Sequence, residues 1–320
     1  MDQAETTQHL AADAQGIARA AALLARGLAV AIPTETVYGL AADARDAQAV
    51  ARIYAAKGRP SHNPLIVHVA GVDQARVLAR FTPQAEALAA AFWPGPLTLV
   101  LPMALDAGLA PAVTAGGGSV ALRLPAHPVA QAVLAAFGGP LAAPSANPSG
   151  RISPTSAAHV LDPQTGLMGR IAAVVDAGPC PVGLESTILG WNAAGAPLIL
   201  RPGGIPAAAL EQVLGRAVGR AGTDDTAPVA PGMLSSHYAP NASLRLNAAP
   251  HAGETFIGFG PGKGDLNLSP SGDLAEAAAN LFDTLRRADA LGRPIAVAPI
   301  PTEGIGAAIN DRLSRAAAPR

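Results

Sequence analysis

Apolar and polar positions alternate along the chain in short blocks, and these blocks predict alternating helices and strands. Positions 7–26 are apolar at helical spacing and end at Arg26-Gly27, a basic last turn followed by glycine. We therefore expect one helix over residues 7–26. The short apolar run Leu28 to Ile32 that follows is expected to be a strand.

The same alternation continues to about residue 217. Further helices are expected over 46–57, 83–92, 128–137, 155–161 and 206–217, and further strands over 64–69, 97–101, 120–124, 171–175 and 198–200. Asp46 is the predicted cap of the helix over 46–57, and Gly58 is its predicted stop. Helices that alternate with strands indicate an α/β domain.

Residues 219–231 break this pattern, because they are rich in Gly, Ala, Thr, Asp and Pro and have no apolar period. Beyond them we expect strands over 255–259 and 294–298 and helices over 274–290 and 307–317. The chain therefore divides into a domain over 1–217, a linker over 218–240 and a small Rossmann-like α/β domain over 241–320.

Composition narrows the classes of function. Cys180 is the only cysteine and the seven histidines show no metal-ligand spacing, so neither a disulfide nor a protein-held metal is expected. A formal net charge of -1 argues against a nonspecific nucleic-acid binder. No apolar run approaches the roughly 20 residues of a membrane span, and the N-terminus is acidic, so we expect a cytoplasmic protein without a membrane partner.

Polar side chains gather where predicted strands end. Lys57 and Arg59 lie in a loop with neutral hydrogen-bonding groups, directly before the apolar strand over 64–69. The other clusters are Thr34, His68, Arg123, Ser145 with Asn147, Ser186 and Arg201. Because ligands of open α/β sheets bind at the carboxyl ends of strands, we expect these side chains to line one crevice. Four cations with Glu35 and Glu185 as the acids suit a ligand with several negative charges, such as a nucleoside triphosphate together with a carboxylate.

Several of these clusters also have a structural explanation. Arg123 suits an ion pair as well as a ligand contact, Thr34 suits a turn or cap, and Asn147-Pro148 is a turn signal. The glycine-rich segment 258–264 contains Lys263 but lacks the spacing of a phosphate-binding P-loop, so we interpret it as a flexible loop.

Seven motifs in this order resemble the YrdC-like domain of threonylcarbamoyl-AMP synthases, over roughly residues 15–210. They are Pro33-Thr-Glu-Thr-Val-Tyr-Gly-Leu40, Lys57-x-Arg59-Pro, Asn63-Pro-Leu-Ile-Val-His68, Trp93-Pro-Gly-Pro-Leu-Thr98, Arg123-x-Pro-x-His-Pro128, Ala143-Pro-Ser-Ala-Asn147 and Glu185-Ser-Thr187. The segment ending in His237-Tyr-Ala-Pro240 and the C-terminal domain resemble the longer, two-domain form of the family. The resemblance implies a twisted mixed sheet flanked by helices.

It also implies a reaction in which L-threonine, bicarbonate or CO2, and ATP give threonylcarbamoyl-AMP, pyrophosphate and water. The implied product feeds the threonylcarbamoyladenosine modification of tRNA through a downstream tRNA threonylcarbamoyl transferase. Mg²⁺ is expected to arrive with ATP, held by phosphate and water. Direct binding of tRNA is left open.

The family pattern assigns roles residue by residue. Around the triphosphate and the reacting carbamate it places Lys57, Arg59, Ser145 and Asn147. Around threonine it places Thr34, His68, Arg123, Ala143 and Ser186. Further contacts to ATP are Ser61, Asn63, Thr114, Ser153, Arg201, His237 and Tyr238. The last two would reach over the nucleotide as part of a lid, although Tyr238 also suits a simple interdomain contact.

Two other functions are compatible with parts of this pattern. A carbamoyl-adenylate enzyme of the hydrogenase-maturation type also contains a YrdC-like domain, but it would need acylphosphatase and zinc-finger modules that this sequence lacks. An RNA-binding module without catalysis is disfavoured by the balanced charge.

Overall fold

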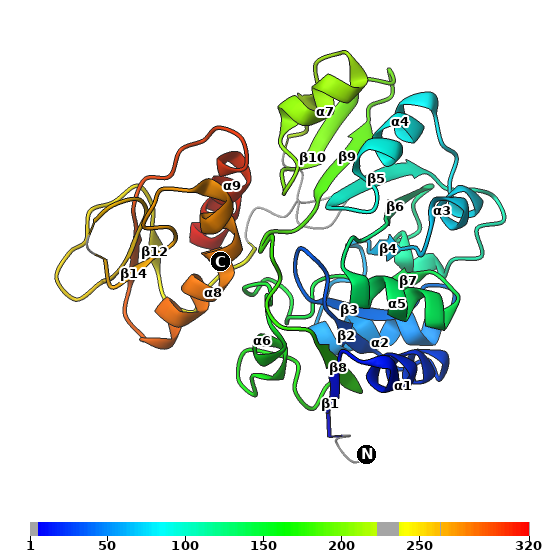
Figure 1. The fold of residues 1–320 in the computed structure, drawn as a ribbon, viewed down its shortest axis with the longest axis horizontal. Helices are drawn as coiled ribbons and strands as arrows, with labels where there is room; N and C mark the ends of the chain where they lie inside the picture. Colours follow the sequence, from blue (N-terminus) through cyan, green and yellow to red (C-terminus); the bar gives the residue numbers. More distant parts are fainter. Residues whose placement is uncertain (1–5, 223–236, 263, 320) are drawn as a thin grey trace.

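The computed structural model describes residues 6–222, 237–262 and 264–319. These residues form two α/β units that lie side by side (Figure 1). Most of the predicted linker, including Leu234 to Ser236 before His237, lies outside the described residues. The predicted domain boundaries at 217 and 240 stay predictions.

A mixed sheet of eleven strands forms the larger unit, in the order β1-β8-β2-β3-β7-β4-β6-β5-β9-β10-β11. Its strands are β1 (Gln8–Ala11), β2 (Val30–Ile32), β3 (Gly39–Asp43), β4 (Ile66–His68), β5 (Leu97–Pro102), β6 (Ser119–Arg123), β7 (Leu141–Ala142), β8 (Ala173–Asp176), β9 (Thr187–Trp191), β10 (Pro197–Arg201) and β11 (Gly219–Arg220). The mixed sheet flanked by helices confirms the expected fold class.

Helices lie on both faces of this sheet. They are α1 (Ala14–Ala25), α2 (Ala47–Lys57), α3 (Val72–Leu78), α4 (Pro83–Phe92), α5 (Pro128–Phe137), α6 (Ala157–Leu161) and α7 (Ala207–Leu214). Residues of α2, α4 and α7 belong to the core on one face, and α1 and α5 pack together over β2, β3, β7 and β8 on the other. Because His68 of β4 pairs in register with Leu141 of β7, the two side chains point to the same face of the sheet. This is the face on which α1 and α5 pack over β2, β3, β7 and β8.

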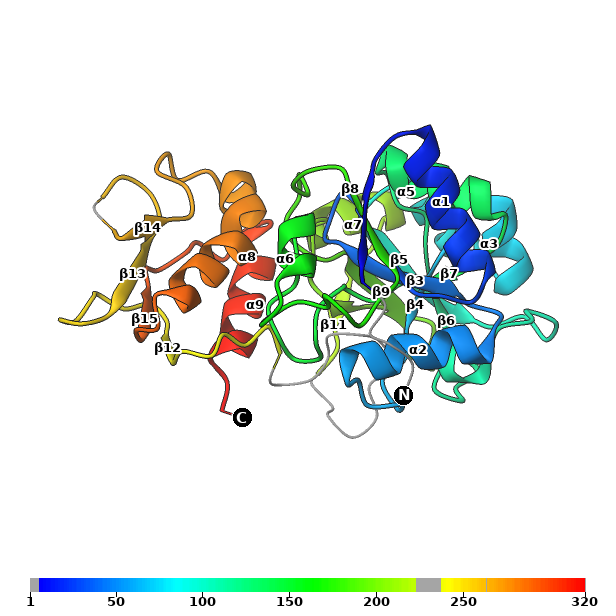
Figure 2. The same cartoon turned by 90° about the horizontal axis from the view of Figure 1, so that it is seen from below.

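The smaller unit is a parallel sheet in the order β12-β15-β13-β14. Its elements are β12 (Leu244–Arg245), β13 (Thr255–Gly258), β14 (Leu266–Asn267), α8 (Leu274–Ala290), β15 (Ile295–Val297) and α9 (Gly306–Ala317). Helices α8 and α9 lie between this small sheet and the larger unit (Figures 1 and 2). Their buried side chains share one apolar cluster with Val37, Ile152 and Leu184 of the larger unit, so the two units share an apolar interface.

Several predicted helices are confirmed with their ends. The helices over 83–92, 128–137 and 274–290 begin and end as expected. The Asp46 side chain accepts a hydrogen bond from the Gln48 amide at the start of α2, and Gly58 ends that helix at a φ of 59°.

The helix expected over 7–26 is confirmed from residue 14 to residue 25, but its first part is wrong. Gln8–Ala11 is a strand that pairs with Ala173–Asp176, and α1 begins only after the cap residue Asp13. The pairing partner lies far along the chain, so local periodicity carries no sign of it. The strand β3 and the short helix α3 were not predicted.

The expectation that the polar clusters line one crevice is confirmed for most of them, but their expected placement at the carboxyl ends of strands is only partly correct. Strand β7 runs antiparallel to β4, and β5 runs antiparallel to β6, so their carboxyl ends point to opposite edges. Ser186 precedes β9 rather than following a strand. The clusters meet instead on the face of the sheet, where His68 and Arg123 pair in register.

Candidate active site

A small cavity of about 40 Å³ lies on this face of the sheet. It is lined by Thr36, Val37, Arg59, Ile66, His68, Arg123, Ala143, Pro144, Ser145, Glu185, Ser186, Arg201, His237 and Tyr238. Since a buried water needs roughly 10–15 Å³, the cavity has room for a few waters.

Two buried cations fix the loops on this side of the cavity: Lys57 ties the end of α2 to the loop after β7, and Arg59 holds the loop before β4. The Lys57 Nζ atom donates to the carbonyl oxygens of Ser145 at 2.6 Å and Asn147 at 2.5 Å. Arg59 donates through Nε to the Asn63 carbonyl at 3.1 Å and through Nη2 to the Pro64 carbonyl at 2.8 Å. The two segments that sequence reasoning expected to meet are therefore in direct contact.

Burial makes both cations costly in the absence of an anion. It lowers the pKa of Lys57 well below its usual value, and the Arg59 charge adds to this effect. Burial likewise lowers the pKa of Arg59 to about 10. A bound anion would offset these costs, because an opposite charge nearby favours the charged forms.

Arg123 forms a buried ion pair beside the cavity. Its Nη2 atom donates to Glu35 Oε1 at 2.6 Å, and its Nη1 atom donates to Thr36 Oγ1 at 2.9 Å. Burial acts to raise the pKa of the Glu35 carboxyl, but the charge and hydrogen bond of Arg123 outweigh it, so that pKa is lowered. The structural explanation of Arg123 is thus present, and its contact with a ligand stays a prediction.

His68 is held neutral on the same side of the cavity. Burial, followed by the nearby Arg123 charge, lowers its pKa to about 3. Within the described residues its Nδ1 atom is buried without a hydrogen-bond partner. The same is true of the polar atoms Asn147 Oδ1, His237 Nδ1 and Tyr238 Oη. Buried polar atoms are rarely left unpaired, so these groups are suited to contact a ligand.

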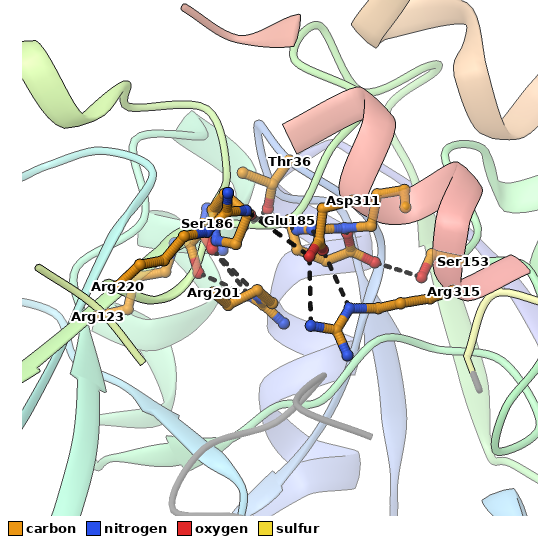
Figure 3. Close-up of polar contacts among 11 residues, drawn as sticks. Thr36, Arg123, Ser153, Glu185, Ser186, Arg201, Arg220, Asp311 and Arg315 are labelled. Carbon is orange, nitrogen blue, oxygen red and sulfur yellow. Dashed lines mark hydrogen bonds and ion pairs between the residues drawn. The ribbon is translucent and has the colours of Figure 1, made fainter. Parts of the chain in front are cut away.

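Ser186 is held at the wall of the cavity from two sides. Its hydroxyl lies 2.7 Å from Thr98 Oγ1, and Arg201 Nη2 donates to the same hydroxyl at 3.1 Å and to the Ser186 carbonyl at 2.9 Å. Figure 3 shows Arg201 reaching toward Ser186, with Glu185 beside it and bonded to Ser153. The turn before β9 and the end of β10 therefore meet at the Ser186 hydroxyl.

Two family models match nearly the whole chain. The model described as Telomere recombination matches residues 22–203, and the model described as Threonylcarbamoyl-AMP synthase, C-terminal domain, matches residues 205–318. The threonylcarbamoyl-AMP synthase of Bacillus subtilis is 43% identical, with 99% of this chain and 97% of that protein covered. The synthase of Pyrococcus abyssi is 41% identical, with 93% and 92% covered.

The chain belongs to the threonylcarbamoyl-AMP synthase family. A crystal structure of P. abyssi Sua5 complexed with L-threonine shares its fold, with a TM-score of 0.88, 37% identity and 97% of both chains covered. The E. coli YciO structure, at 18% identity and a TM-score of 0.53, is similar in fold alone. These relatives identify the chain as an enzyme, and the predicted family resemblance is confirmed.

Lys57 and the remaining predicted residues of this family member are not among the residues that line the cavity. Thr34 is buried but its Oγ1 atom donates to the Val37 carbonyl at 2.6 Å, so it holds the loop as a turn residue does. Asn147 donates to the Pro148 and Arg151 carbonyls at 2.8 Å. Asn63 and Ser153 are buried, Thr114 faces the Pro111 carbonyl, and Ser61 is exposed and absent from the lining.

His237 and Tyr238 line the cavity and also join the two units. The Tyr238 ring stacks on Phe282 of α8 with centroids 5.5 Å apart, so the interdomain contact foreseen for it exists alongside its place at the cavity. Tyr238 has a φ of 61°, which is costly for a bulky residue. A strained backbone held by packing is common at functional sites.

Sequence reasoning placed Glu185 in the crevice as an acid but did not assign Thr36, Val37, Ile66 or Pro144 to the lining. Thr36 and Val37 belong to the motif over 33–40 and Glu185 to the motif over 185–187, so the motifs held a signal for them. Cys180 is buried with its pKa raised to about 12 by burial, which does not suit a nucleophile.

In the described part of the chain, no group of three or more His, Cys, Asp or Glu side chains is placed to hold a metal ion. None of its helices is long and apolar enough to cross a membrane.

Proposed function

We propose that this cavity binds L-threonine beside ATP and forms threonylcarbamoyl-AMP and pyrophosphate from them with bicarbonate or CO2. The observation that carries the proposal is that Arg59, Arg123 and Arg201, all buried, line one cavity. The buried Lys57 lies next to this cavity, because its Nζ atom donates to the carbonyl of the lining residue Ser145. Glu35 and Glu185 are already paired with arginines. The net positive environment suits a triphosphate together with a carboxylate.

The proposed chemistry needs no nucleophile from the protein. The deprotonated amine of threonine adds to CO2 and gives a carbamate. A carbamate oxygen then attacks the α-phosphorus of ATP in line, the bond to the bridging oxygen breaks, and pyrophosphate leaves with its electron pair. The protein contributes by holding the reactants close together and by stabilising the charge that develops.

Lys57 and Arg59 are placed to stabilise that charge. Since their pKa values are lowered by burial without a ligand, phosphate oxygens would be strong partners for both. The neighbouring Ser145 and Asn147 would complete this side of the site, and Ser61, Asn63, Thr114, Ser153, Arg201, His237 and Tyr238 stay proposed contacts to ATP. Loss of one such preorganised donor typically costs about 3 kcal/mol of transition-state stabilisation.

The other side of the cavity is suited to threonine. Arg123 would face the threonine carboxylate with the N–H groups not used by Glu35 and Thr36. His68 is neutral, so it can accept a hydrogen bond from the amine or hydroxyl without repelling a cation. Ser186 supplies a hydroxyl, Ala143 lines the wall, and Thr34 fixes the loop above them.

Mg²⁺ stays a proposal and would enter with ATP. The acids next to the cavity, Glu35 and Glu185, are occupied by Arg123 and Arg312. Phosphate oxygens and water are therefore the fitting ligands for the ion.

The test is a reaction with ATP, Mg²⁺, bicarbonate and L-threonine, followed for pyrophosphate and, by mass spectrometry, for the adenylate. We expect both products, and both should disappear when threonine is left out. Pyrophosphate release that does not depend on threonine would refute the proposal.

ATP binding is expected to take up protons at alkaline pH. Lys57 has a lowered pKa in the free protein, and the phosphates of ATP would raise it, so the lysine gains a proton on binding. Calorimetric titration in two buffers of different ionisation enthalpy measures the uptake. Lys57→Arg should bind ATP with less uptake, and equal uptake by the two proteins would exclude Lys57 as its source.

The alternative functions gain no support. The full-length HypF structure is 22% identical with a TM-score of 0.51, so this likeness shows the fold alone. Delivery of the product to a downstream tRNA threonylcarbamoyl transferase and a cytoplasmic location follow from the proposed reaction. Direct contact with tRNA stays open.

A further inference from the structure

Arg312 of α9 is fully buried where the two units meet. Its Nε atom donates to Glu185 Oε2 at 2.7 Å, and its Nη2 atom donates to the Pro202 carbonyl at 2.9 Å. Its Nη1 atom donates to Asp311 Oδ2 at 2.7 Å. All three guanidinium nitrogens therefore have partners, and two of these partners belong to the larger unit.

Both partners in the larger unit adjoin residues of the cavity. Glu185 directly precedes Ser186, and its other oxygen, Oε1, accepts a hydrogen bond from the Ser153 hydroxyl at 2.5 Å. Pro202 directly follows Arg201, which donates to the Ser186 carbonyl. One side chain from the smaller unit thus fixes both segments that hold Ser186.

Arg312 also supports the aromatic wall of the cavity. Its guanidinium carbon lies 5.1 Å from the centroid of the Tyr238 ring. The backbone amide of His237 donates to the Arg315 carbonyl one turn further along α9. In Figure 3, Arg315 lies beside Asp311 on the helix that faces Glu185.

The ion pair of Arg312 and Glu185 is not the only contact between the units. The surrounding contact is apolar, with Leu184, Phe282 and Tyr238 in one cluster. Replacement of a buried ion pair by apolar side chains is often neutral or stabilising, so a buried pair is weak evidence for stability as its purpose. The planar guanidinium of Arg312 instead orients its partners, because it donates to several acceptors in fixed directions at once.

We propose that Arg312 is a positioning residue of the active site, through which the C-terminal unit orients Glu185 and so presents Ser186 to L-threonine. This inference rests on the proposed function, since it takes threonine as the ligand of Ser186. It gives the C-terminal unit a role in forming the substrate site.

The test measures binding of L-threonine by calorimetry, without any turnover. Arg312→Lys keeps the charge but cannot reach three acceptors in the same plane. We expect it to raise the dissociation constant of threonine about 10-fold, a usual size for coupled neighbours. Arg287→Lys is the matched control, because Arg287 lies on α8 with a side chain 62% exposed and pairs with Asp283 at 3.7 Å. This control should bind threonine as the parent does.

Glu185→Gln provides a second, independent variant and completes a double-mutant cycle. Its single amide oxygen can still accept from Ser153, but the amide NH2 group that then faces Arg312 Nε is a donor and cannot accept. Threonine binding should therefore again weaken about 10-fold. In the Glu185→Gln background, Arg312→Lys should then have little further effect. Full additivity of the two substitutions would overturn the proposed route through Glu185.

Parent-like threonine binding by Arg312→Lys would overturn the inference, as would equal weakening in Arg287→Lys. If Arg312→Lys does not fold, parent-like binding by Glu185→Gln overturns it. If the parent protein binds ATP but not threonine, this result refutes the proposed function itself, whatever the Arg312 variants do. The two failures are therefore distinguishable.

Discussion

Arg59→Ala is expected to lower turnover roughly 100- to 1000-fold while the protein stays folded. Arg59 lines the cavity, and burial without a ligand lowers its pKa to about 10, so it is suited to take a phosphate oxygen as a partner. Loss of its guanidinium removes a preorganised donor where charge develops on the phosphates. The measurement is the rate of threonine-dependent pyrophosphate release at saturating substrates.

Two further variants make this prediction sharper. Arg76→Ala is the matched control, because Arg76 has a side chain 50% exposed and pairs with Glu86 on the surface. It should retain full turnover. Arg59→Lys should recover only part of the activity, since a lysine cannot also hold the Asn63 and Pro64 carbonyls. Near-parental turnover of Arg59→Ala would remove this residue from the site.

Arg123→Ala is expected to destabilise the protein by about 3–5 kcal/mol and to abolish threonine binding. The substitution leaves the Glu35 carboxylate buried without its counter-ion. Burial then raises the pKa of Glu35, which Arg123 holds down in the parent. Urea unfolding monitored by circular dichroism measures the loss of stability.

The double variant Arg123→Met/Glu35→Gln separates the two roles of this arginine. Removal of both charges should restore most of the stability, because replacing a whole buried pair is often nearly neutral. Threonine binding should stay weak if Arg123 contacts the substrate carboxylate. Recovery of threonine affinity together with stability would show that the ion pair alone is required.

The same pair has a pH signature. Because the folded-state pKa of Glu35 is lowered, its contribution to stability is present above the ordinary value of 4.5 and is lost as the pH falls through the folded-state pKa. Glu35→Gln should therefore flatten the dependence of the unfolding free energy on pH below that value. An unchanged slope would exclude Glu35 as a contributor.

Elements with strong local signals could be predicted from the amino-acid sequence. The Asp46 cap and Gly58 stop set α2, and the helices over 83–92 and 274–290 follow from their apolar periods. The motifs also named most of the cavity lining, since Arg59, His68, Arg123 and Ser186 lie in them. These features depend on residues close together in the chain, which local propensity and turn chemistry describe well.

Contacts between distant segments of the fold set which groups meet and what they can do, and these contacts could not be predicted from the sequence. The strand at Gln8–Ala11 exists because β8 pairs with it across the fold, and the antiparallel β7 moved the site from the sheet edge to its face. The pairing of Arg123 with Glu35, and of Arg312 with Glu185 across the unit boundary, joins residues far apart in sequence. Burial and charge pairing arise from the whole packed fold, so no local pattern contains them.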